Sequence, residues 1–289
     1  MKKIFIVGSI NTDLVIETPY MPKAGETLTG SGFFTAHGGK GANQAVAATR
    51  LGGKVVMCGC VGDDEFGKSA LESLKSDGAD VSHIRTVNGV PTGTAVIIVE
   101  KGDNRIILDK GANFCLSEKD IDNVLEQANT GDIYLTQLEN PIDIIGYGIK
   151  KAKEKGLYVV LNPAPADKAI EPYLGYCNLI TPNETELEIF GGVDYLLTKV
   201  ETILVTLGGK GFDIIDKGGH RHFDCMKVKV VDTTSAGDTL CGGLVAMLSK
   251  GNALDESAVF GSKAASIACT KKGAQPSIPT FEEVQSYNS

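Results

Sequence analysis

The group of residues best suited to chemistry is Asp232-Thr-Thr-Ser-Ala-Gly-Asp238-Thr-Leu-Cys-Gly-Gly243, which runs from a strand into a small-residue turn and a helix. Ser235, Ala236 and Gly237 can present successive N–H groups to negative charge on a transferring phosphoryl group. Asp238, in the first helical turn, can accept the proton of an attacking hydroxyl. A helix cap followed by close packing of the paired glycines explains the same residues equally well. Both interpretations stay open at this point.

Other polar clusters follow predicted strands. Asn11 and Asp13 come after the first strand and offer an amide and a carboxylate of the kind that bind a vicinal diol. His37-Gly-Gly-Lys-Gly-Ala-Asn-Gln44 is a glycine turn that opens a helix, and Thr206-Leu-Gly-Gly-Lys-Gly211 and Glu139 lie at further strand ends. Each cluster alone is more often a turn or a cap. Together they indicate a site, because open α/β sheets bind ligands at the carboxyl ends of their strands.

One motif matches a nucleotide-binding loop but does not suit it. Gly62-Asp-Asp-Glu-Phe-Gly-Lys-Ser69 fits G-x-x-x-x-G-K-[ST] and follows a strand. Its three acidic residues would repel a phosphate from the backbone N–H groups that should hold it. They suit the first turn of a helix near Phe66, so a nucleotide hydrolase of this type is disfavoured.

Two candidate metal or redox groups also have simpler explanations. His220, His222 and Asp224 alternate along a predicted strand, and a solvated hairpin face is favoured over a metal site because the sequence nearby offers no fourth ligand. The seven cysteines contain no C-x-x-C pair, and Cys58 and Cys60 fit a buried strand.

Composition excludes several classes of protein. The chain has 289 residues, 42% of them hydrophobic, and carries a net charge of −8, so neither nucleic acid nor a membrane is an expected partner. The apolar run after Met1 is too short for a signal peptide, and we expect a cytoplasmic protein. Glycine is abundant, with 35 residues, and clustered, which points to backbone lying close to a ligand.

The elements that must position these residues alternate between strands and helices. Non-alternating apolar runs predict buried parallel strands at 4–7, 55–59, 133–136, 158–161, 179–181 and 202–207. Helices are expected at 42–51, 66–77, 118–128, 142–155, 236–250 and 254–270, with a last one near Phe281. Ser117 and Asp120 resemble a capping box, and Gly156 a C-cap. We predict one α/β domain over 1–289 with a mostly parallel sheet flanked by helices.

Two segments interrupt this alternation. Residues 13–36 and 90–110 contain short strands and turns but no helix, including a predicted hairpin turn at 101–104. We expect them to form a small β-sheet subdomain that serves as a lid or a dimer contact.

Taken in order along the chain, these motifs resemble those of the ribokinases, within the PfkB-type carbohydrate kinases. The matching stretches cover nearly the whole chain: Gly8-Ser-Ile-Asn-Thr-Asp13, Gly38-Gly-Lys-Gly-Ala-Asn-Gln44, Gln137-Leu-Glu139, Asn162-Pro-Ala-Pro165, Thr181-Pro-Asn-Glu-Thr-Glu186, Asp232-Thr-Thr-x-Ala-Gly-Asp238 and Gly273-Ala-Gln-Pro-Ser277. The resemblance implies ATP-dependent phosphorylation of D-ribose at O5 by direct in-line transfer.

The resemblance also implies roles for individual residues. Asp238 is then the base, beside the anion hole of Ser235, Ala236 and Gly237. The sugar would be held by Asn11, Thr12, Asp13, Gly39, Lys40, Gly41, Ala42, Asn43 and Glu139. The nucleotide would border Asn183, Thr206, Leu207, Gly208, Gly209, Lys210, Gly211, Gly237, Asp238 and Ser262.

The resemblance further implies two cations and a partner. Glu186 would lie near Mg²⁺, which offsets phosphate charge. An activating K⁺ would be bound, mostly through carbonyls, at Asp232, Thr234, Ala268, Lys271, Gly273 and Ser277. The small sheet would form a lid and a homodimer contact.

The chain departs from the family pattern at three places. Ser235 stands where glycine is frequent, 190–203 is shorter than usual, either by deletion or because residues are missing, and Ser262 replaces a larger side chain of some relatives. Three alternatives remain: a kinase of deoxyribose, another pentose or a nucleoside; a non-catalytic sugar-binding regulator; and the disfavoured nucleotide hydrolase. Asp13 and Asn43 favour a sugar with free vicinal hydroxyls.

Overall fold

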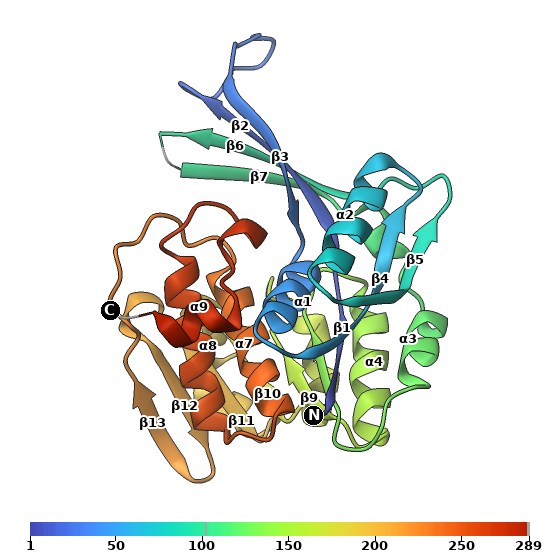
Figure 1. Ribbon diagram of the computed structural model, residues 1–289, viewed down its shortest axis with the longest axis vertical. Helices are drawn as coiled ribbons and strands as arrows, with labels where there is room; N and C mark the ends of the chain where they lie inside the picture. Colours follow the sequence, from blue (N-terminus) through green and yellow to red (C-terminus); the bar gives the residue numbers. More distant parts are fainter. Residues whose placement is uncertain (102, 288–289) are drawn as a thin grey trace.

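The large sheet organises the molecule. The computed structural model describes residues 1–101 and 103–287, and its nine-stranded sheet has the order β13-β12-β11-β10-β9-β8-β1-β4-β5 (Figure 1). From β11 to β5 neighbouring strands are parallel, whereas β12 and β13 pair antiparallel. The strands are β1 (Lys3–Val7), β4 (Lys54–Gly62), β5 (Asp80–Val87), β8 (Ile133–Thr136), β9 (Tyr158–Leu161), β10 (Leu179–Ile180), β11 (Thr202–Thr206), β12 (Phe212–Asp216) and β13 (Gly219–Phe223).

Helices cover both faces of this sheet because its strands are apolar on both sides. On one face, buried residues of α1 (Lys40–Arg50), α2 (Glu65–Ser76), α7 (Ala236–Ser249) and α8 (Leu254–Ala268) pack against the sheet. On the other lie α3 (Glu118–Leu125), α4 (Ile142–Glu154), α5 (Glu184–Ile189), α6 (Gly192–Leu196) and the 3₁₀ segment η2 (Lys168–Tyr176). Helix α9 (Phe281–Ser286) packs on α8. Short 3₁₀ turns occur at Gly111–Cys115, Gly208–Lys210 and Gln275–Ser277.

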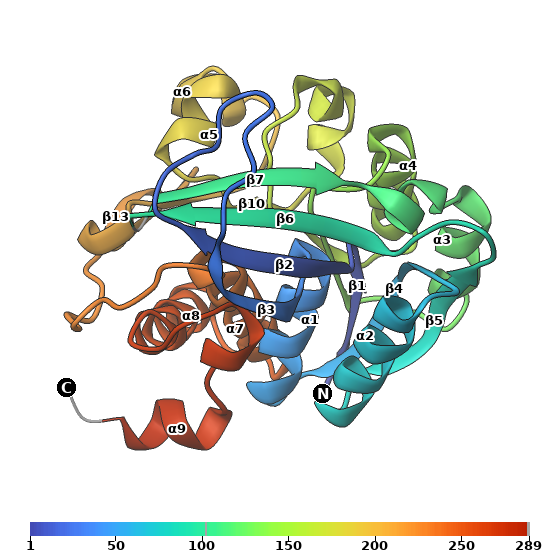
Figure 2. The ribbon, with the colours of Figure 1, turned by 90° about the horizontal axis from the view of Figure 1, so that it is seen from above.

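A second, four-stranded sheet projects from one end of this body. Its order is β3-β2-β6-β7; it lies at the top of the molecule in Figure 1 and crosses in front of the body in Figure 2. Strands β2 (Asn11–Thr18) and β3 (Ser31–Gly38) come from the first interrupting segment, and β6 (Gly93–Glu100) and β7 (Asp103–Asp109) from the second. β6 and β7 pair antiparallel, as expected of a hairpin, but its turn includes Gly102, which lies outside the described residues.

Most of the sequence-based element predictions are confirmed to within a few residues. The strands at 133–136 and 158–161 agree in both bounds. Ser117 and Asp120 form the expected capping box, and Gly156 follows α4 with a φ of 81°. The apolar runs did not predict β5 or β12, because polar residues interrupt the apolar ones in both strands.

The segment 190–203, which is shorter than usual for the family, still packs into the core. Two short helices, α5 and α6, meet at Gly191 and Gly192, which both have positive φ. Phe190, Leu196 and Val200 are buried and join the core on that face of the sheet. The chain therefore reaches β11 by a short route that still packs.

Helices α1 and α7 lie unusually close together. A Cβ built on Gly242 would come 2.4 Å from the Ala47 Cβ and 2.7 Å from the Ala48 nitrogen. Gly242 therefore fixes the distance between the two helices, as its suspected packing role suggested. Both helices begin at the same edge of the sheet, where the carboxyl ends of the parallel strands lie.

We expect Gly242→Ala to destabilise the protein by about 1–3 kcal/mol, because the added methyl overpacks the α1–α7 contact. Thermal unfolding followed by circular dichroism measures the change. Gly175→Ala is the matched control, since a Cβ there meets only the Lys199 oxygen, 3.8 Å away. Equal stability of the two variants would contradict this account of the helix contact.

Candidate active site

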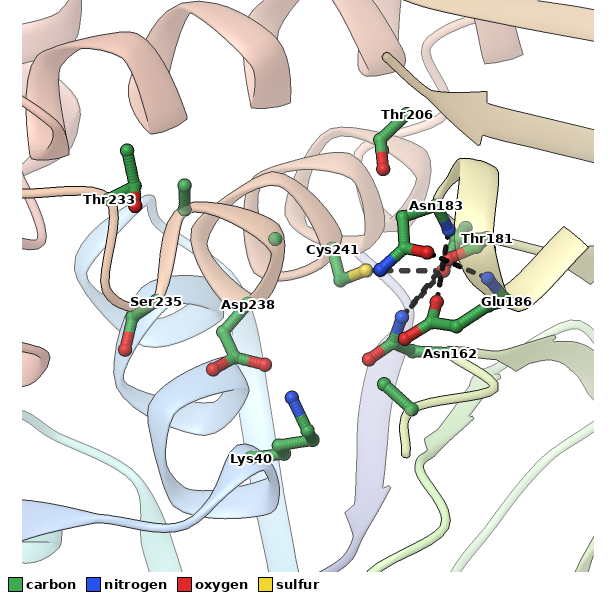
Figure 3. Close-up of a pocket in the computed structure, with 13 residues that line it drawn as sticks. Lys40, Asn162, Thr181, Asn183, Glu186, Thr206, Thr233, Ser235, Asp238 and Cys241 are labelled. Carbon is green, nitrogen blue, oxygen red and sulfur yellow. Dashed lines mark hydrogen bonds between the residues drawn. The ribbon is translucent and has the colours of Figure 1, made fainter. Parts of the chain in front are cut away.

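A polar cavity of about 230 Å³ lies where strand ends and helix starts meet (Figure 3). Its walls come from the ends of β9, β10 and β11 and from the first turns of α1 and α7. The lining residues are Lys40, Asn162, Ala164, Thr181, Asn183, Glu186, Thr206, Thr233, Ser235, Ala236, Gly237, Asp238 and Cys241. The predicted clusters at 38–44, 183–186, 206–211 and 232–238 therefore all contribute to one region.

Asp238 is held by two amides from α1. Asn43 Nδ2 donates to Asp238 Oδ2 over 3.1 Å, and Gln44 Nε2 donates to Asp238 Oδ1 over 3.0 Å. The residue is only 7% exposed, and each of its two carboxylate oxygens has an amide donor. It is thus presented to the cavity as a fixed acceptor.

The orientation of the Gln44 amide is set by other buried amides. Gln137 Nε2 donates to Gln44 Oε1 over 2.6 Å, so the Gln44 nitrogen must face the opposite way. That nitrogen also donates to Asn162 Oδ1 over 3.1 Å, and Asn162 Nδ2 donates to the Thr181 carbonyl. A buried network across three strands therefore aims Gln44 at Asp238.

The turn before α7 is strained at one residue. Ser235 has φ 61° and ψ 13°, a left-handed conformation that favours glycine. Its hydroxyl accepts from Asn43 Nδ2 over 2.9 Å, which ties the turn to α1. The Ala236 N–H donates to the Thr233 carbonyl over 3.1 Å, so in this conformation it is engaged within the turn. The N–H groups of Gly237 and Asp238 lie in the first helical turn, where helices offer no internal acceptor.

The residues expected to hold a sugar lie beside Lys40. Glu139 Oε2 accepts from the Lys40 backbone N–H over 3.1 Å and from the Ser9 hydroxyl. Asn11 is fixed by Asn113, whose Nδ2 donates to Asn11 Oδ1 over 2.7 Å. Thr12 is buried, and its hydroxyl has no hydrogen-bond partner in the described part of the chain.

Gly39 and Gly41, which flank the start of α1, lie too close to neighbouring backbone to carry a side chain. Gly39 has φ 87°, and a Cβ on it would come 2.8 Å from the Asn11 nitrogen. A Cβ on Gly41 would come 2.5 Å from the Gly8 carbonyl carbon, and Ala42 is fully packed. The glycine turn thus lets α1 begin directly against the end of β1.

Charge is concentrated at this edge. Burial raises the pKa of Asp13 to about 6, and the negative charge of Glu139 adds to the shift. Burial alone would lower the pKa of Lys40, but three carboxylates raise it overall; they belong to Asp238, Glu139 and Glu186. Lys40 points toward Asp238 in Figure 3 and stays charged among these acids.

A larger cavity of about 500 Å³ adjoins the first and is mostly apolar. The two share Thr206, Thr233, Ala236 and Gly237. Of the predicted nucleotide-binding residues, Thr206, Gly208, Gly209, Gly237 and Ser262 line it. Leu207, Lys210 and Gly211 do not, although they complete the turn after β11. Met226, Val228, Val230 and Leu240 supply its apolar surface.

Asn183 and Glu186 are linked to each other. The Asn183 side chain accepts from the Glu186 N–H over 2.8 Å, and Glu186 Oε2 accepts from the Asn183 N–H over 2.9 Å. This capping box starts α5. Burial raises the pKa of Glu186, while the Asn183 N–H and Lys40 oppose the shift. The pair is therefore both a helix cap and part of the cavity wall.

The residues expected at a K⁺ site belong to two loops held side by side. Asp232 Oδ1 accepts from the N–H and the hydroxyl of Thr234, and Oδ2 accepts from the Gly273 N–H over 2.9 Å. Partial burial would raise the pKa of Asp232, but these bonds lower it. The Ala268 carbonyl accepts from the Lys271 N–H, and Ser277 lies in the following turn. An ionised carboxylate among backbone carbonyls suits a hard cation.

The structure agrees with the hairpin interpretation of the histidines. His220 and His222 both contact Asp213, at 2.8 and 2.6 Å, on the surface of the β12–β13 hairpin. Within residues 1–101 and 103–287, no group of three His, Cys, Asp or Glu residues could hold a metal ion. Cys58 and Cys60 are buried free thiols, as expected.

The structure also explains the segment 62–69, whose sequence matches a phosphate-binding loop. Asp64 caps α2 by accepting from the Gly67 N–H over 2.8 Å, and it also accepts from the N–H and hydroxyl of Thr92. Lys68 is exposed and pairs with Glu65. The Asp64 carboxylate therefore already accepts the Gly67 N–H, which a phosphate-binding loop would present to a phosphate.

Comparison with known proteins agrees with this geometry. Residues 1–281 match the family described as pfkB family carbohydrate kinase. The chain belongs to this family. A ribokinase of Haemophilus influenzae is 44% identical, with 98% of this chain and 97% of that protein covered, and a deoxyribokinase of Salmonella typhi is 35% identical, with 99% and 98% covered.

Solved structures of the family have the same fold. A ribokinase of Thermotoga maritima has a TM-score of 0.90 at 36% identity, covering 99% of this chain and 98% of that one. An Arabidopsis thaliana ribokinase, whose structure is described as complexed with ribose and ATP, has a TM-score of 0.87 at 30% identity, with 99% of both chains covered. The predicted fold class is confirmed, and this pfkB protein is a carbohydrate kinase.

Several residues of the site were not singled out from the sequence. Asn113 and Ser9 fix predicted sugar-site residues, while Cys225 and Cys269 line the larger cavity. Gln44, Gln137 and Asn162 were visible only as letters of motifs. Nothing in their spacing shows a partner that lies 93 or more residues away.

We expect Glu139→Gln to lower the pKa of Asp13 from its value of about 6, because one like charge is removed. Burial persists, so the pKa should stay above the ordinary value. Carbon-13 NMR titration of the aspartate carboxyls measures this shift. Glu17→Gln, on the same strand as Asp13, is the control that should leave it unchanged. An unmoved Asp13 in Glu139→Gln would show that the two carboxylates do not interact.

Proposed function

We propose that this carbohydrate kinase phosphorylates D-ribose at O5 with ATP, giving ribose 5-phosphate and ADP. The observation that carries the proposal is the position of Asp238. Its carboxylate lies at the first turn of α7, where a polar cavity meets a larger apolar one. A hydroxyl from the polar side and a phosphoryl group from the other can meet there in line.

The residues proposed to hold the sugar, of which Lys40 and Asp238 line the polar cavity, supply acceptors and donors that match a furanose. Asp13 and Glu139 can accept from hydroxyls, while Asn11 and Asn43 can donate or accept. In this proposal Thr12, Gly39, Lys40, Gly41 and Ala42 would complete the sugar site, with the glycines allowing close approach of backbone; Lys40 is the one of them that lines the polar cavity.

The chemical step assigns distinct tasks to the residues of the turn. Asp238 accepts the proton of the O5 hydroxyl as its oxygen attacks phosphorus. Lys40 is positive and lies nearby, so it stabilises charge that develops on the transferring group. The N–H groups of Ser235, Ala236 and Gly237 form the anion hole, which requires the Ala236 N–H to leave its Thr233 partner.

The larger cavity suits the adenosine part of ATP. Its apolar lining can cover a base, and Asn183 and the turn 206–211 border the path of the phosphates. Ser262 leaves room where a larger side chain would narrow the cavity.

Two cations fit residues of the site. Glu186 offers a carboxylate to Mg²⁺, a cation that prefers oxygen ligands. When bound, Mg²⁺ would offset the negative charge of the phosphates. The two loops with Asp232, Thr234, Ala268, Lys271, Gly273 and Ser277 suit K⁺. Because Asp232 and Thr234 directly precede Ser235, and Gly273 is hydrogen-bonded to Asp232, K⁺ would stabilise the anion hole's shape.

Two alternatives can be weighed against the site. A deoxyribose or nucleoside kinase would use the same base, but Asp13 and Asn43 favour free vicinal hydroxyls, whose loss leaves buried polar groups unpaired. A regulator that binds sugar without catalysis would not need the Asp238 carboxylate to be held by the amides of Asn43 and Gln44. We therefore favour ribose.

The first test is coupled ADP release with ribose, deoxyribose, other pentoses and nucleosides, with Mg²⁺ in K⁺ and then Na⁺ buffer. We expect turnover with ribose at least tenfold above the other sugars, and faster in K⁺. Turnover with another sugar alone would overturn the substrate, and equal rates in both buffers would overturn the K⁺ site.

Asp238→Asn should lower kcat by about 10²–10⁴-fold, the usual contribution of a general base. Ribose affinity, measured by calorimetry, should change far less. Asp255→Asn is the control, because it removes a carboxylate that pairs with Arg221 on the surface. Full activity of Asp238→Asn would overturn the assigned base.

We also propose a cytoplasmic homodimer formed through the small sheet. No helix within the described residues is long and apolar enough to span a membrane. The small sheet exposes Phe33, Ile106 and Ile107 at 64%, 61% and 67%, which is a large apolar area for a monomer. The same sheet would serve as the lid over the sugar.

Ile107→Asp should shift the protein from dimer to monomer, because a charge would be buried at the contact. Sedimentation velocity measures the change. Val259→Asp, on the exposed face of α8, is the control that should leave the mass unchanged. A wild-type monomer, or a dimer unaffected by Ile107→Asp, would contradict the proposal.

A further inference from the structure

We propose that Gln275, in the short turn after α8, is a positioning residue for the phosphoryl-transfer step. Its side-chain amide sets the orientation of the Asn43 amide, which in turn holds the Asp238 carboxylate. The inference rests on the proposed function in one respect, because Asp238 must be the base. Gln275 is not among the residues that line either cavity, so it acts through Asn43 rather than on a substrate.

The Gln275 side chain reaches α1 from a distant part of the chain. Its Nε2 donates to Asn43 Oδ1 over 3.2 Å, and the two residues are 232 positions apart. Gln275 is 4% exposed and Asn43 is 6% exposed, so little water is available to replace this donor. A buried oxygen that loses its donor stays unpaired, which costs free energy. The bond therefore favours one orientation of the Asn43 amide.

The two ends of the Asn43 amide face opposite partners. Its oxygen accepts from Gln275, while Nδ2 donates to the Ser235 hydroxyl over 2.9 Å and to Asp238 Oδ2 over 3.1 Å. Both hydrogens of Nδ2 are thereby used. A flipped amide would turn its oxygen toward the Asp238 carboxylate and its nitrogen toward the Gln275 nitrogen. Gln275 therefore selects the orientation in which Asn43 donates to the base.

The other oxygen of Asp238 is held by a matching arrangement. Gln44 Nε2 donates to Asp238 Oδ1 over 3.0 Å, and Gln137 Nε2 donates to Gln44 Oε1 over 2.6 Å. Each of the two amides on α1 thus has a second amide that donates to its oxygen. Gln137 follows β8 in the middle of the sheet, whereas Gln275 comes from the carboxy-terminal part of the chain. Loss of Gln275 should therefore loosen one carboxylate oxygen and leave the other held.

The turn that carries Gln275 is attached to α1 at a second point. Arg50, the last residue of α1, donates from Nη1 to the Gln275 carbonyl over 2.6 Å and to the Ile278 carbonyl over 3.1 Å. Arg50 Nε and Nη2 also donate to the Asp77 carboxylate, over 2.6 and 3.1 Å. The backbone of the turn is thus fixed to the end of α1 and its side chain to the beginning. This double attachment gives Gln275 the defined position that an orienting donor requires.

The test compares the steady-state kinetics of the full-length Gln275→Met variant and the wild type, with ATP and the sugar that the wild type phosphorylates. Met is similar in size to Gln but cannot donate. We expect kcat to fall about tenfold to a hundredfold, because small misplacements of a reacting group cost rates of this order. The KM for ATP should change less than twofold, since Gln275 lies outside the larger cavity. A wild-type kcat in the folded variant would overturn the proposal.

Gln127→Met is the matched control for a glutamine that loses its hydrogen bonds. Gln127 Oε1 accepts from Lys3 Nζ over 2.8 Å, and Lys3 begins β1 at the opposite edge of the sheet from the site. This variant should keep the wild-type kcat. Gln275→Glu is the second variant should Gln275→Met fail to fold, because it keeps the shape and replaces the donor with an acceptor. It should lower kcat at least as much as Gln275→Met.

A double-mutant cycle separates positioning from a purely structural role. In an Asn43→Ala background the amide that Gln275 orients is gone, so adding Gln275→Met should lower kcat less than threefold further. Losses of equal size in the two backgrounds would show that Gln275 acts by another route and would overturn the proposal.

Failure of this inference is distinguishable from failure of the proposed function. Full activity of Asp238→Asn would remove the base, and with it the role of Gln275. A wild-type kcat in Gln275→Met beside an inactive Asp238→Asn would keep the base and overturn only the positioning residue. Turnover of a sugar other than ribose would change the substrate and leave the cycle to be measured with that sugar.

Discussion

The contact on which the site depends is the pair of amides that α1 extends to the Asp238 carboxylate on α7. Asn43 and Gln44 each donate to one carboxylate oxygen, so the two hydrogen bonds fix the orientation of the group. The residues lie about 195 positions apart in the chain. Their meeting requires that α1 and α7 start at one edge of the sheet and pack closely, which Gly242 allows.

Electrostatic balance is the second constraint on this edge. The carboxylates of Asp238, Glu139 and Glu186 raise the pKa of Lys40, and Glu139 also interacts with Asp13. Burial, with a further contribution from the charge of Glu139, raises the pKa of Asp13 to about 6. Hydroxyl donors from a sugar and cations with the phosphates would relieve this repulsion, so the site is built for ligands that bring donors and positive charge.

The fold explains why the smaller cavity is polar and the larger one is mostly apolar. Parallel strands end together and leave polar groups at their carboxyl ends, which form the smaller cavity. The larger cavity lies beyond the sheet centre, between α7, α8 and the segment after β13, and is therefore lined by apolar side chains and by two thiols. The turn before α7 borders both cavities through Thr233, Ala236 and Gly237, and Ser235 in the same turn has a φ of 61°.

The sequence by itself determined the fold class, most helices and strands, the glycine turns and the chemical types at the strand ends. These follow from local signals: apolar runs, caps at Ser117 and Asp120, and the positive φ that glycine allows. It did not determine the partners of Asp238 or the cavity shared by Cys225 and Cys269. Those depend on distances between residues far apart in the chain, and only the packing of α1, α7 and α8 on the sheet decides them.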